Sequence, residues 1–420
     1  MNAAPTTLRV WWICGILLAA SAINYLDRQT LSGTSAQIIA EFELTKEKYG
    51  TFETAFGLAF AVGAVCFGFL ADRVNVRLLY PLVLLLWSAT GFCTGLVNTY
   101  ARLLACRFFL GFFEAGHWPC ALKTTRRLLP PEKRTLGNSV LQSGTALGAI
   151  AAPQVIKWMT DDQTRGGWRP AFLVVGAVGT IWIVFWLLSV RSRDLVDEPE
   201  DSAAKQPVSG DGASFLECVF SRRFLILVLV VVSINLCWHQ FRVWMMLFLQ
   251  EGRGYSRNAA LDFVTWFNIA TDVGCLLAGA ATAALTHRLS VHGARVAVFG
   301  VCAGLVALGA FVPQLPQGTS LQVVLLLVGC GALGLFPCYY SLTQELSQQH
   351  LGKITGSLGA VAWGFPAAWH WLFGRWVDAT KSYDRGMQLA ALLPLVALVA
   401  LAFWPREEAE LSERNGKLSR

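Results

Sequence analysis

Runs of about 20 apolar residues recur along this chain, and they constrain its fold more than any other feature. The cleanest of them, at 78–98, 169–190, 294–312 and 386–404, contain almost no ionisable side chain. Helices that are apolar on every side need lipid or protein around them, which a soluble enzyme cannot supply for so many. Of the 420 residues 55% are hydrophobic and only 15% are charged. The sequence therefore predicts an all-α membrane protein and excludes a soluble enzyme.

Short charged clusters separate the apolar runs, and they define the predicted membrane-spanning helices to within a few residues. Twelve spans are expected, at 9–32, 49–71, 78–98, 101–127, 135–159, 169–190, 222–249, 257–286, 294–313, 320–346, 353–378 and 385–404. The longest polar insert, 191–214, combines charge, Pro and Gly without periodicity, which predicts a flexible linker. Six spans precede this linker and six follow it.

This arrangement predicts two pseudo-symmetric six-helix bundles. We expect an N-terminal bundle at 1–192, a cytoplasmic linker at 193–220, a C-terminal bundle at 221–406 and a cytoplasmic tail at 407–420. With the N-terminus inside, cytoplasmic segments carry about 19 Lys and Arg residues and outside loops about 9, which fits the excess that cytoplasmic loops hold. Both termini are therefore expected in the cytoplasm, in a multi-pass protein of the cell inner membrane. The net charge of +7 reflects this topology and predicts no nucleic acid partner.

The 11 cysteines lie singly in apolar stretches, as Cys14, Cys66 and Cys275 do. Neither a CxxC pair nor a Cys/His spacing typical of zinc sites occurs, so we predict no disulfide framework, metal site or other cofactor. The first apolar stretch continues past Ile23 without a small-residue cleavage site, which argues against a cleavable signal peptide. The expected partners are a lipid bilayer and a small molecule, and we expect a monomer.

Ionisable residues inside the predicted spans are costly, so each is a hypothesis about function. The acids and arginines concerned are Asp27, Arg28, Arg107, Glu114, Arg242, Asp272 and Glu345, and the histidines are His117, His239 and His370. We expect His117 and His370 to be packing residues, and Glu53 to lie near the outer membrane interface. The roles of Glu53, Asp272 and Glu345 stay open.

Arg107 and Glu114 are seven residues apart in the fourth span, which places them on one helix face, about 10 Å from each other. An arginine attracts a substrate carboxylate, and an acid can carry a proton. Burial raises the pKa of a carboxylic acid and a neighbouring arginine lowers it, so a substrate that reaches the arginine would change the proton affinity of the acid. The spacing therefore indicates a coupled pathway for an anion and a proton.

The loop between the second and third spans carries the motif Gly68-Phe-Leu-Ala-Asp72-Arg73-Val-Asn75-Val-Arg77. It resembles the loop signature of the major facilitator superfamily, whose fold is twelve helices in two halves. The resemblance implies that the glycine allows close helix approach, and that Asp72, Arg73 and Arg77 form a charge network that latches the halves on the cytoplasmic side. Asn75 replaces the second glycine of the signature and can adopt a left-handed turn conformation.

Further motifs resemble the anion:cation symporter family, which includes bacterial hexuronate and D-galactonate transporters, sialin and vesicular glutamate carriers. They are Ile23-Asn-Tyr25-Leu-Asp27-Arg28-Gln-Thr-Leu, Gly111-Phe-Phe-Glu114-Ala-Gly-His-Trp-Pro119, and Pro131-Glu-Lys-Arg134 followed by Ser143-Gly144, Gly148 and Pro153. The region 334–356 looks most like the hexuronate branch. The stretch around Trp363 lacks the asparagine that galactonate carriers use in their eleventh helix, which argues against galactonate itself.

The resemblance and the intramembrane charges together assign roles to individual residues. Asp27 and Glu114 would be the proton-coupling acids. Substrate contacts would come from Tyr25, Arg28, Arg107, Thr145, His239, Arg242, Tyr339, Tyr340, Gln344 and Trp363. The glycines expected to let helices pack closely are Gly144, Gly148, Gly356 and Gly359.

The resulting hypothesis is proton-coupled uptake of a sugar acid by alternating access, with a hexuronate such as glucuronate or galacturonate preferred. One alternative is a carrier of another organic anion, such as an aldonate, a dicarboxylate, a phosphonate or an amino-acid derivative. Sodium in place of the proton, and a membrane sensor that does not transport, are two more. The short linker and tails leave no room for a signalling domain, which argues against the sensor.

Overall fold

The computed structural model describes residues 7–129, 131–161, 164–191, 195, 215–344, 346 and 351–405. Within these ranges the side chains of Asp72, Gln344, 131–136, 138–139 and 351–353 lie outside the description. The predictions for Glu345, for most of the linker and for the tail at 407–420 also concern residues outside the described ones.

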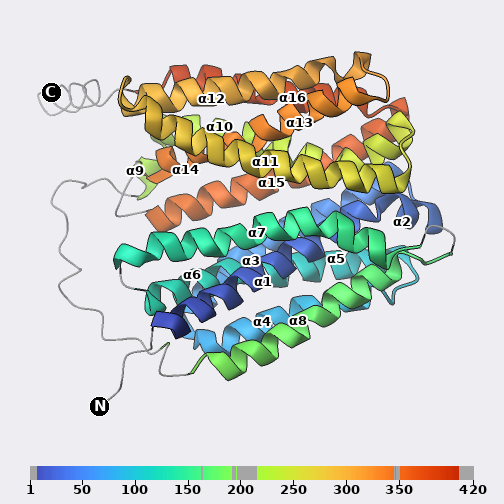
Figure 1. The fold of residues 1–420 in the computed structure, drawn as a ribbon, viewed down its shortest axis with the longest axis horizontal. Coiled ribbons are helices and arrows are strands. Elements are labelled where there is room, and N and C mark those ends of the chain that lie inside the picture. The colour runs from blue at the N-terminus through green and yellow to red at the C-terminus, as the bar shows by residue number, and fades with distance from the viewer. Residues whose placement is uncertain are drawn as a thin grey trace, which may run out of the picture. The chain divides into compact units, whose positions relative to one another are not determined.

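The described residues are almost all helical, and no strand occurs among them (Figure 1). The first half contains α1 (Thr7–Gly33), α2 (Ser35–Glu41), α3 (Lys46–Arg73), α4 (Val76–Thr94), α5 (Tyr100–Glu114), α6 (His117–Leu128), α7 (Pro131–Met159) and α8 (Arg169–Ser189). The second half contains α9 (Phe215–Val219), α10 (Arg222–Leu247), the π-helix η3 (Phe248–Gly252), α11 (Arg257–Leu285), α12 (Val291–Ala307), the 3-10 helix η4 (Leu308–Gln314), α13 (Thr319–Gly334), α14 (Phe336–Gln344), α15 (Leu351–Thr380) and α16 (Asp384–Ala402).

The predicted spans match these helices closely, and the all-α fold class is confirmed. Apolar runs of this length become helices because a helix satisfies its own backbone hydrogen bonds where no water is available. In the described part of the chain, nine helices are long and apolar enough to cross a membrane. The predicted spans 101–127, 135–159 and 353–378 are helical too, but they fall outside that group of nine.

The fourth predicted span is two helices rather than one, since α5 ends at Glu114 and α6 begins at His117. Gly116 lies at the break, and a Cβ at this position would meet the side chains of Val83 and Phe67. Tight packing therefore requires glycine here, and glycine weakens a helix interior by about 1 kcal/mol relative to alanine. The tenth predicted span is likewise interrupted, at Leu335 between α13 and α14.

The structure contains two compact units, and each is described by itself. The first comprises 1–206, 242–269 and 363–383, and the second comprises 207–241, 270–362 and 384–420. The first unit therefore holds the six N-terminal spans together with parts of α10, α11 and α15. The boundaries predicted for the two bundles and the linker stay a prediction.

Within the first unit, α1 lies along α7, α3 along α5, and α4 along α8 (Figure 1). The close approach of α7 to α1 depends on two glycines, because a Cβ on Gly144 or Gly148 would collide with the backbone of α1. The sequence prediction of close packing is thus confirmed for these two. It is wrong for Gly356 and Gly359, where an added Cβ would meet no described atom within 4 Å.

The start of α3 is tied, inside the first unit, to segments from the second half of the chain. Asp378 accepts hydrogen bonds from the backbone N–H groups of Lys46 and Glu47, both at 2.8 Å. Lys46 Nζ pairs with Glu251 Oε1 at 2.6 Å, and Glu251 Oε2 accepts a bond from the Tyr383 hydroxyl at 2.7 Å. Burial, and then the adjacent Glu251 carboxylate, raise the pKa of Tyr383, so this hydroxyl stays a donor. These five residues are called the Asp378 network.

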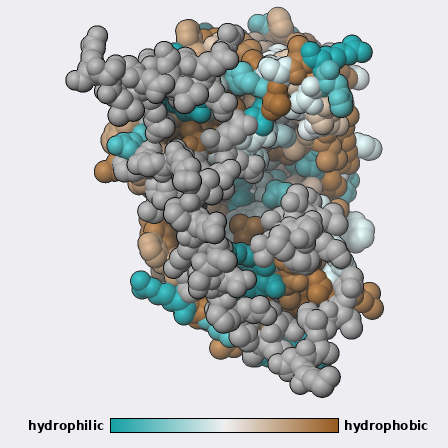
Figure 2. Space-filling view, turned by 90° about the vertical axis from the view of Figure 1, so that its left-hand side faces the viewer, coloured by the Kyte–Doolittle hydropathy of each residue, from teal (hydrophilic) through white to brown (hydrophobic). Residues whose placement is uncertain are grey.

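In the second unit, α12 packs against α13 and α16, with Phe299 fully buried. Both units also expose large apolar side chains, among them Leu188 at 77% and Leu276 at 74% exposure. Figure 2 shows such hydrophobic residues reaching the surface on one face. Many exposed large apolar side chains fit contact with lipid rather than water, as expected for a multi-pass membrane protein.

Candidate functional site

Arg28 of α1 and Glu114 of α5 form a buried ion pair inside the first unit. The Glu114 Oε2 atom accepts bonds from Arg28 Nη2 at 2.8 Å and from Arg28 Nε at 3.3 Å. The Nη2 atom also donates to Asn24 Oδ1 at 3.1 Å. The side chain of Arg28 is 7% exposed and that of Glu114 is 0% exposed. Because two donors of the guanidinium converge on one oxygen, Glu114 holds this arginine in a defined orientation.

Four aromatic rings surround the Arg28 guanidinium. Its carbon lies 5.4 Å from the ring centre of Tyr25, 5.3 Å from those of Phe56 and Phe60, and 5.1 Å from that of Trp363. Trp363 stacks on Phe60 with ring centres 4.4 Å apart. Aromatic faces attract a desolvated cation by about 2 kcal/mol. The cage therefore stabilises Arg28 without supplying a second anion.

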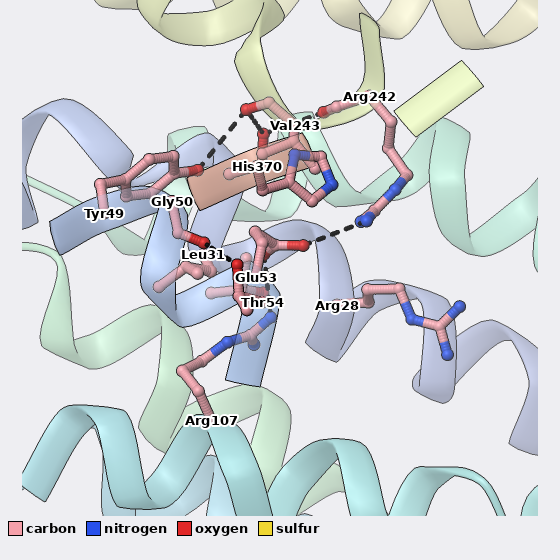
Figure 3. Close-up of polar contacts among 12 residues, drawn as sticks. Arg28, Leu31, Tyr49, Gly50, Glu53, Thr54, Arg107, Arg242, Val243 and His370 are labelled. Carbon is pink, nitrogen blue, oxygen red and sulfur yellow. Dashed lines mark hydrogen bonds and ion pairs between the residues drawn. The ribbon is translucent and has the colours of Figure 1, made fainter. Parts of the chain in front are cut away.

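A second centre lies around Glu53 of α3, which bridges two arginines (Figure 3). Glu53 Oε1 accepts a bond from Arg107 Nη2 of α5 at 3.0 Å, and Glu53 Oε2 accepts one from Arg242 Nη2 of α10 at 3.1 Å. The side chains of Glu53 and Arg242 are 2% exposed and that of Arg107 is 0% exposed. His370 of α15 lies beside Glu53 (Figure 3).

Phe56 joins the two centres. Its ring centre is 5.3 Å from the Arg28 guanidinium carbon and 4.7 Å from that of Arg107. One aromatic side chain on α3 thus packs against both cations, and Glu53 precedes it by less than one helical turn. Arg28, Glu53, Arg107, Glu114 and Arg242 are together called the buried arginine cluster.

Arg107 and Glu114 both lie buried on α5, as their spacing predicts, but they form ion pairs with different residues. The expectation that substrate at Arg107 changes the proton affinity of Glu114 stays a prediction. Each of the two side chains forms its ion pair with a residue of another helix, since a buried charge needs a counter-charge at hydrogen-bond distance.

Several polar atoms in this region have no hydrogen-bond partner among the described residues. Among them are Asp27 Oδ2, Arg107 Nε, Arg107 Nη1 and Glu114 Oε1. Buried donors and acceptors of this kind are rare in native proteins, and a ligand or water is one common explanation. The buried arginine cluster therefore has unused donors at Arg107 and an unused acceptor at Glu114.

Asp27 precedes Arg28 in the chain and faces α4, where a Cβ on Gly91 would come within 3.0 Å of Asp27 Oδ1. The residue is 2% exposed. No ion pair to Asp27 is found in the described part of the chain, although the carboxyl interacts electrostatically with Arg107 and Glu114. A buried carboxyl without a cation at hydrogen-bond distance is a place where a proton can be carried.

Besides the three arginines, three predicted substrate contacts have defined surroundings in the first unit. Tyr25 and Trp363 form part of the aromatic cage, and both are partly exposed. Thr145 of α7 is 8% exposed. Its hydroxyl donates to the Gln142 carbonyl of the same helix at 2.7 Å. The same hydroxyl accepts a bond from Gln142 Nε2 at 3.2 Å, so it can offer a ligand one remaining acceptor position and no donor.

Other predicted contacts belong to the second unit. His239 is 4% exposed, Tyr339 is 6% exposed and Tyr340 is 55% exposed. The side chain of Gln344 lies outside the described residues, and Asp272 has an unpartnered Oδ2 among the described ones. Their contribution to a site that includes the buried arginine cluster stays a prediction.

The loop motif between α3 and α4 differs from its expected geometry in two respects. Asn75 has φ −63° and caps α4 by accepting the Arg77 N–H at 2.9 Å, so the left-handed turn is wrong. A Cβ on Gly68 would meet no described atom within 4 Å, so close helix approach is wrong here as well. Arg77 Nε donates at 2.8 Å to the carbonyl that follows α8. A latch that includes Asp72 and Arg73 stays a prediction.

His117 packs as expected, while a pure packing role for His370 stays a prediction because its ring also interacts electrostatically with Glu53. His117 Nε2 lies 3.0 Å from the Ser21 hydroxyl and Nδ1 lies 2.8 Å from the Tyr80 hydroxyl, so both ring nitrogens are satisfied. His370 Nδ1 accepts a bond from Trp244 Nε1 at 3.1 Å. Both histidines are buried.

Glu53 is the buried acid whose role the sequence left open. The second span was predicted to begin at residue 49, whereas α3 begins at Lys46, and the expected place of Glu53 near the outer membrane interface stays a prediction. Thr45 caps the helix by accepting the Lys48 N–H, and a threonine directly before a helix is a readable start signal. With that start, Glu53 lies about two turns inside the helix. The role of Phe56 between two arginines had no signal in the sequence.

Comparisons with known proteins agree with this architecture. The hexuronate transporter of Escherichia coli K12 is 23% identical over 279 residues, and the chain spans 64% of the length of that relative, with 64% of this chain covered. The D-galactonate transporter of Escherichia coli O6:H1 is 25% identical over 429 residues, which cover 96% of this chain and 95% of the relative.

Among solved structures, a bacterial homolog of the human lysosomal transporter Spinster, in an inward-facing and unoccupied conformation, has a similar fold. Its TM-score is 0.78 at 17% sequence identity, with 95% of this chain and 97% of that chain covered. At this identity the likeness establishes the fold alone. The family model described as Major Facilitator Superfamily matches residues 17–370. Because that match covers most of the 420 residues, the chain belongs to the Major Facilitator Superfamily.

Proposed function

We propose that this protein is a secondary active carrier that takes up a sugar acid together with a proton by alternating access. The family and the transporters that match the chain support transport rather than an enzymatic reaction. The preferred substrate is a hexuronate such as glucuronate or galacturonate. Uptake would run across the cell inner membrane, with both termini in the cytoplasm and the protein acting as a monomer.

The observation that carries this proposal is the Arg28 centre. A guanidinium binds a carboxylate through paired hydrogen bonds, and aromatic ring faces pack well against the apolar faces of a sugar. Arg28 offers both features, since it is bonded to one carboxylate and enclosed by four rings. A sugar acid carries the two complementary groups, a carboxylate and a ring.

The Arg28–Glu114 pair also provides a route for coupling. A substrate carboxylate that takes the place of Glu114 at Arg28 leaves the Glu114 carboxylate without its cation, and a proton from the outside then neutralises it. Asp27, which has no ion-pair partner among the described residues, would carry a second proton. After the change to the inward-open state, substrate and protons leave to the cytoplasm. A ligand shifts this equilibrium only through its different affinity for the two states.

Uptake of labelled glucuronate into proteoliposomes with an imposed inward proton gradient tests the proposal. We expect accumulation above the external concentration that collapses when an ionophore removes the proton gradient. Absence of gradient-stimulated uptake for every sugar acid in a panel would contradict it. A sodium titration at fixed pH distinguishes sodium coupling, because a sodium-coupled carrier would need the cation and ignore the proton gradient.

A doubly charged organic anion is the second candidate, and the presence of two arginine centres favours it. Arg28 and Arg107 flank one ring, Phe56, and each is bonded to a separate internal carboxylate. A dicarboxylate could replace both internal carboxylates at once. Competition for glucuronate uptake by an aldarate separates the candidates, since stronger inhibition by the aldarate than by glucuronate itself would favour the dianion.

A further inference from the structure

We propose that Arg107 and Arg242 form a carboxylate-binding site that Glu53 fills with its own side chain in this structure. Glu53 is then an internal competitor of the substrate, and the site takes the carboxylate of an organic anion once Glu53 withdraws. This inference rests on the proposed function and adds to it a second binding site and its regulation. It concerns α3, α5 and α10, all of them inside the first unit at these residues.

The geometry of Glu53 is that of a bound ligand. Each of its two oxygens accepts one bond, Oε1 from Arg107 and Oε2 from Arg242, at 3.0 Å and 3.1 Å. The two guanidiniums come from different helices and converge on one carboxylate (Figure 3). A substrate carboxylate presents the same two oxygens at the same spacing, so it can make the same pair of bonds.

Arg107 has donors that Glu53 does not use. Its Nε and Nη1 atoms have no hydrogen-bond partner among the described residues, and its side chain is 0% exposed. Leaving buried donors of a cation unbonded costs stability, so a purely structural pair would be expected to satisfy them. A ligand that carries hydroxyls beside its carboxylate could reach these donors, which a glutamate side chain cannot do.

The charge count supports competition between Glu53 and substrate. With Asp27 included, three carboxylates accompany the three guanidiniums of the buried arginine cluster. Entry of a substrate carboxylate adds a negative charge to a buried region, which is costly unless an internal carboxylate takes up a proton. Glu53 is suited to this role because a neutral carboxyl is a weaker acceptor for Arg107 and Arg242.

The titratable and charged groups around Glu53 come from four helices. Arg107 of α5 and Arg242 of α10 bond to it, and His370 of α15 and Tyr49, one turn earlier on α3, interact with it electrostatically. Tyr49 donates its hydroxyl to the Val243 carbonyl. The proton that neutralises Glu53 enters from solution with the substrate and returns to solution after release, so no other reactant is needed.

The test compares carboxylate binding by the purified full-length protein and by the variant Glu53→Gln. Glutamine keeps the size of the side chain but removes the competing charge. We expect the variant to bind glucuronate roughly tenfold more tightly at pH 7.5, because the competing state is lost. We also expect the dependence of its Kd on pH between 6 and 8 to be weaker than in the wild type. The matched control is Glu251→Gln in the Asp378 network, which should leave Kd unchanged.

Each outcome decides one of the two proposals. The inference is overturned if the Glu53→Gln variant binds glucuronate, gluconate and succinate no more tightly than the wild type does. Gradient-driven uptake of a sugar acid by the wild type would in that case still support the proposed function. Tighter binding of these carboxylates by the variant, without gradient-driven uptake of any sugar acid by the wild type, supports the inference and overturns the proposed function. If Glu53→Gln does not fold, Glu53→Asp replaces it. This shorter side chain cannot reach both arginines, so the Kd of the Glu53→Asp variant for glucuronate should lie between the wild-type value and the value expected for Glu53→Gln. A Kd at or above the wild-type value overturns the inference.

Discussion

The buried arginine cluster and the Asp378 network both hold helices together, but they differ in how far their side chains are exposed. Both connect α3 to segments from the second half of the chain, within the first unit. In the cluster, Glu53 and Arg107 are 2% and 0% exposed, whereas in the network Lys46 and Glu251 are 15% and 37% exposed. Water can therefore replace a lost contact in the network and cannot do so in the cluster.

The difference in exposure predicts a difference in the free energy that each ion pair contributes. Removing one member of a buried ion pair leaves an uncompensated charge and costs about 3–5 kcal/mol. An exposed pair contributes about 0–1 kcal/mol. The arginines of the cluster therefore need a counter-charge, which their own carboxylates supply in this structure and which a substrate carboxylate would supply under the proposed function. The Lys46–Glu251 pair of the network is partly exposed, so its loss should cost less than the loss of a pair in the cluster.

The largest effect is expected for Arg107→Ala. Without this cation, Glu53 keeps only Arg242, and the free energy of unfolding should fall by about 3–5 kcal/mol, with loss of sugar acid binding. Thermal unfolding and glucuronate binding in detergent measure the two effects. Arg107→Lys, which keeps the charge but loses the fork of donors, should recover most of the stability and little of the affinity. If Arg107→Ala is as stable as the wild type, the cluster does not contribute more to stability than the Asp378 network does.

Glu114→Gln should separate coupling from binding. The amide still fills the space beside Arg28 but carries no proton, so accumulation driven by a proton gradient should fall well below the wild-type ratio, with only the protons of the other carboxyls left to couple. Counterflow exchange of labelled for unlabelled glucuronate should persist, since exchange needs no net proton movement. If both activities are lost to the same degree, Glu114 serves binding or structure instead.

Asp378→Ala probes the network at its helix cap. The change removes both acceptors of the Lys46 and Glu47 N–H groups, and loss of such a cap costs about 1 kcal/mol. We expect a small drop in the thermal midpoint with uptake retained. Asp378→Asn keeps one acceptor oxygen and should lose less. A loss of stability as large as that of Arg107→Ala would show that this network is as indispensable as the cluster.

The smallest effect is expected for Lys157→Gln. Lys157 bonds to both oxygens of Asp262 at 2.8 Å, but the two side chains are 30% and 47% exposed. Solvent screening reduces such a pair to less than about 0.5 kcal/mol, so the thermal midpoint should hardly change. A clear destabilisation would mean that exposure alone does not separate structural contacts from the functional cluster.

Much of the fold could be predicted from the sequence because it follows from local pattern. Apolar runs mark the helices, and the seven-residue spacing on α5 correctly places Arg107 and Glu114 on one buried face. The break between α5 and α6 was missed, since hydropathy does not register a glycine that packs against Val83, and the break at Leu335 between α13 and α14 was missed as well.

The pairing inside the cluster could not be predicted, because it depends on which helices lie side by side. Arg28 and Glu114 are 86 positions apart in the chain, and Arg242 and Glu53 are 189 apart. No periodicity connects positions so distant. The cap at Thr45, directly before α3, is the local signal that would have placed Glu53 about two turns inside its helix.

The most direct test of the central claim is the movement of protons that accompanies substrate. Unlabelled glucuronate is added outside proteoliposomes that have no pH gradient and are held at zero membrane potential, and the external pH is recorded. The account predicts alkalinisation of the medium that depends on glucuronate and that is smaller in Glu114→Gln, although this variant still exchanges labelled substrate. Uptake of glucuronate by the wild type without any change in external pH would contradict it.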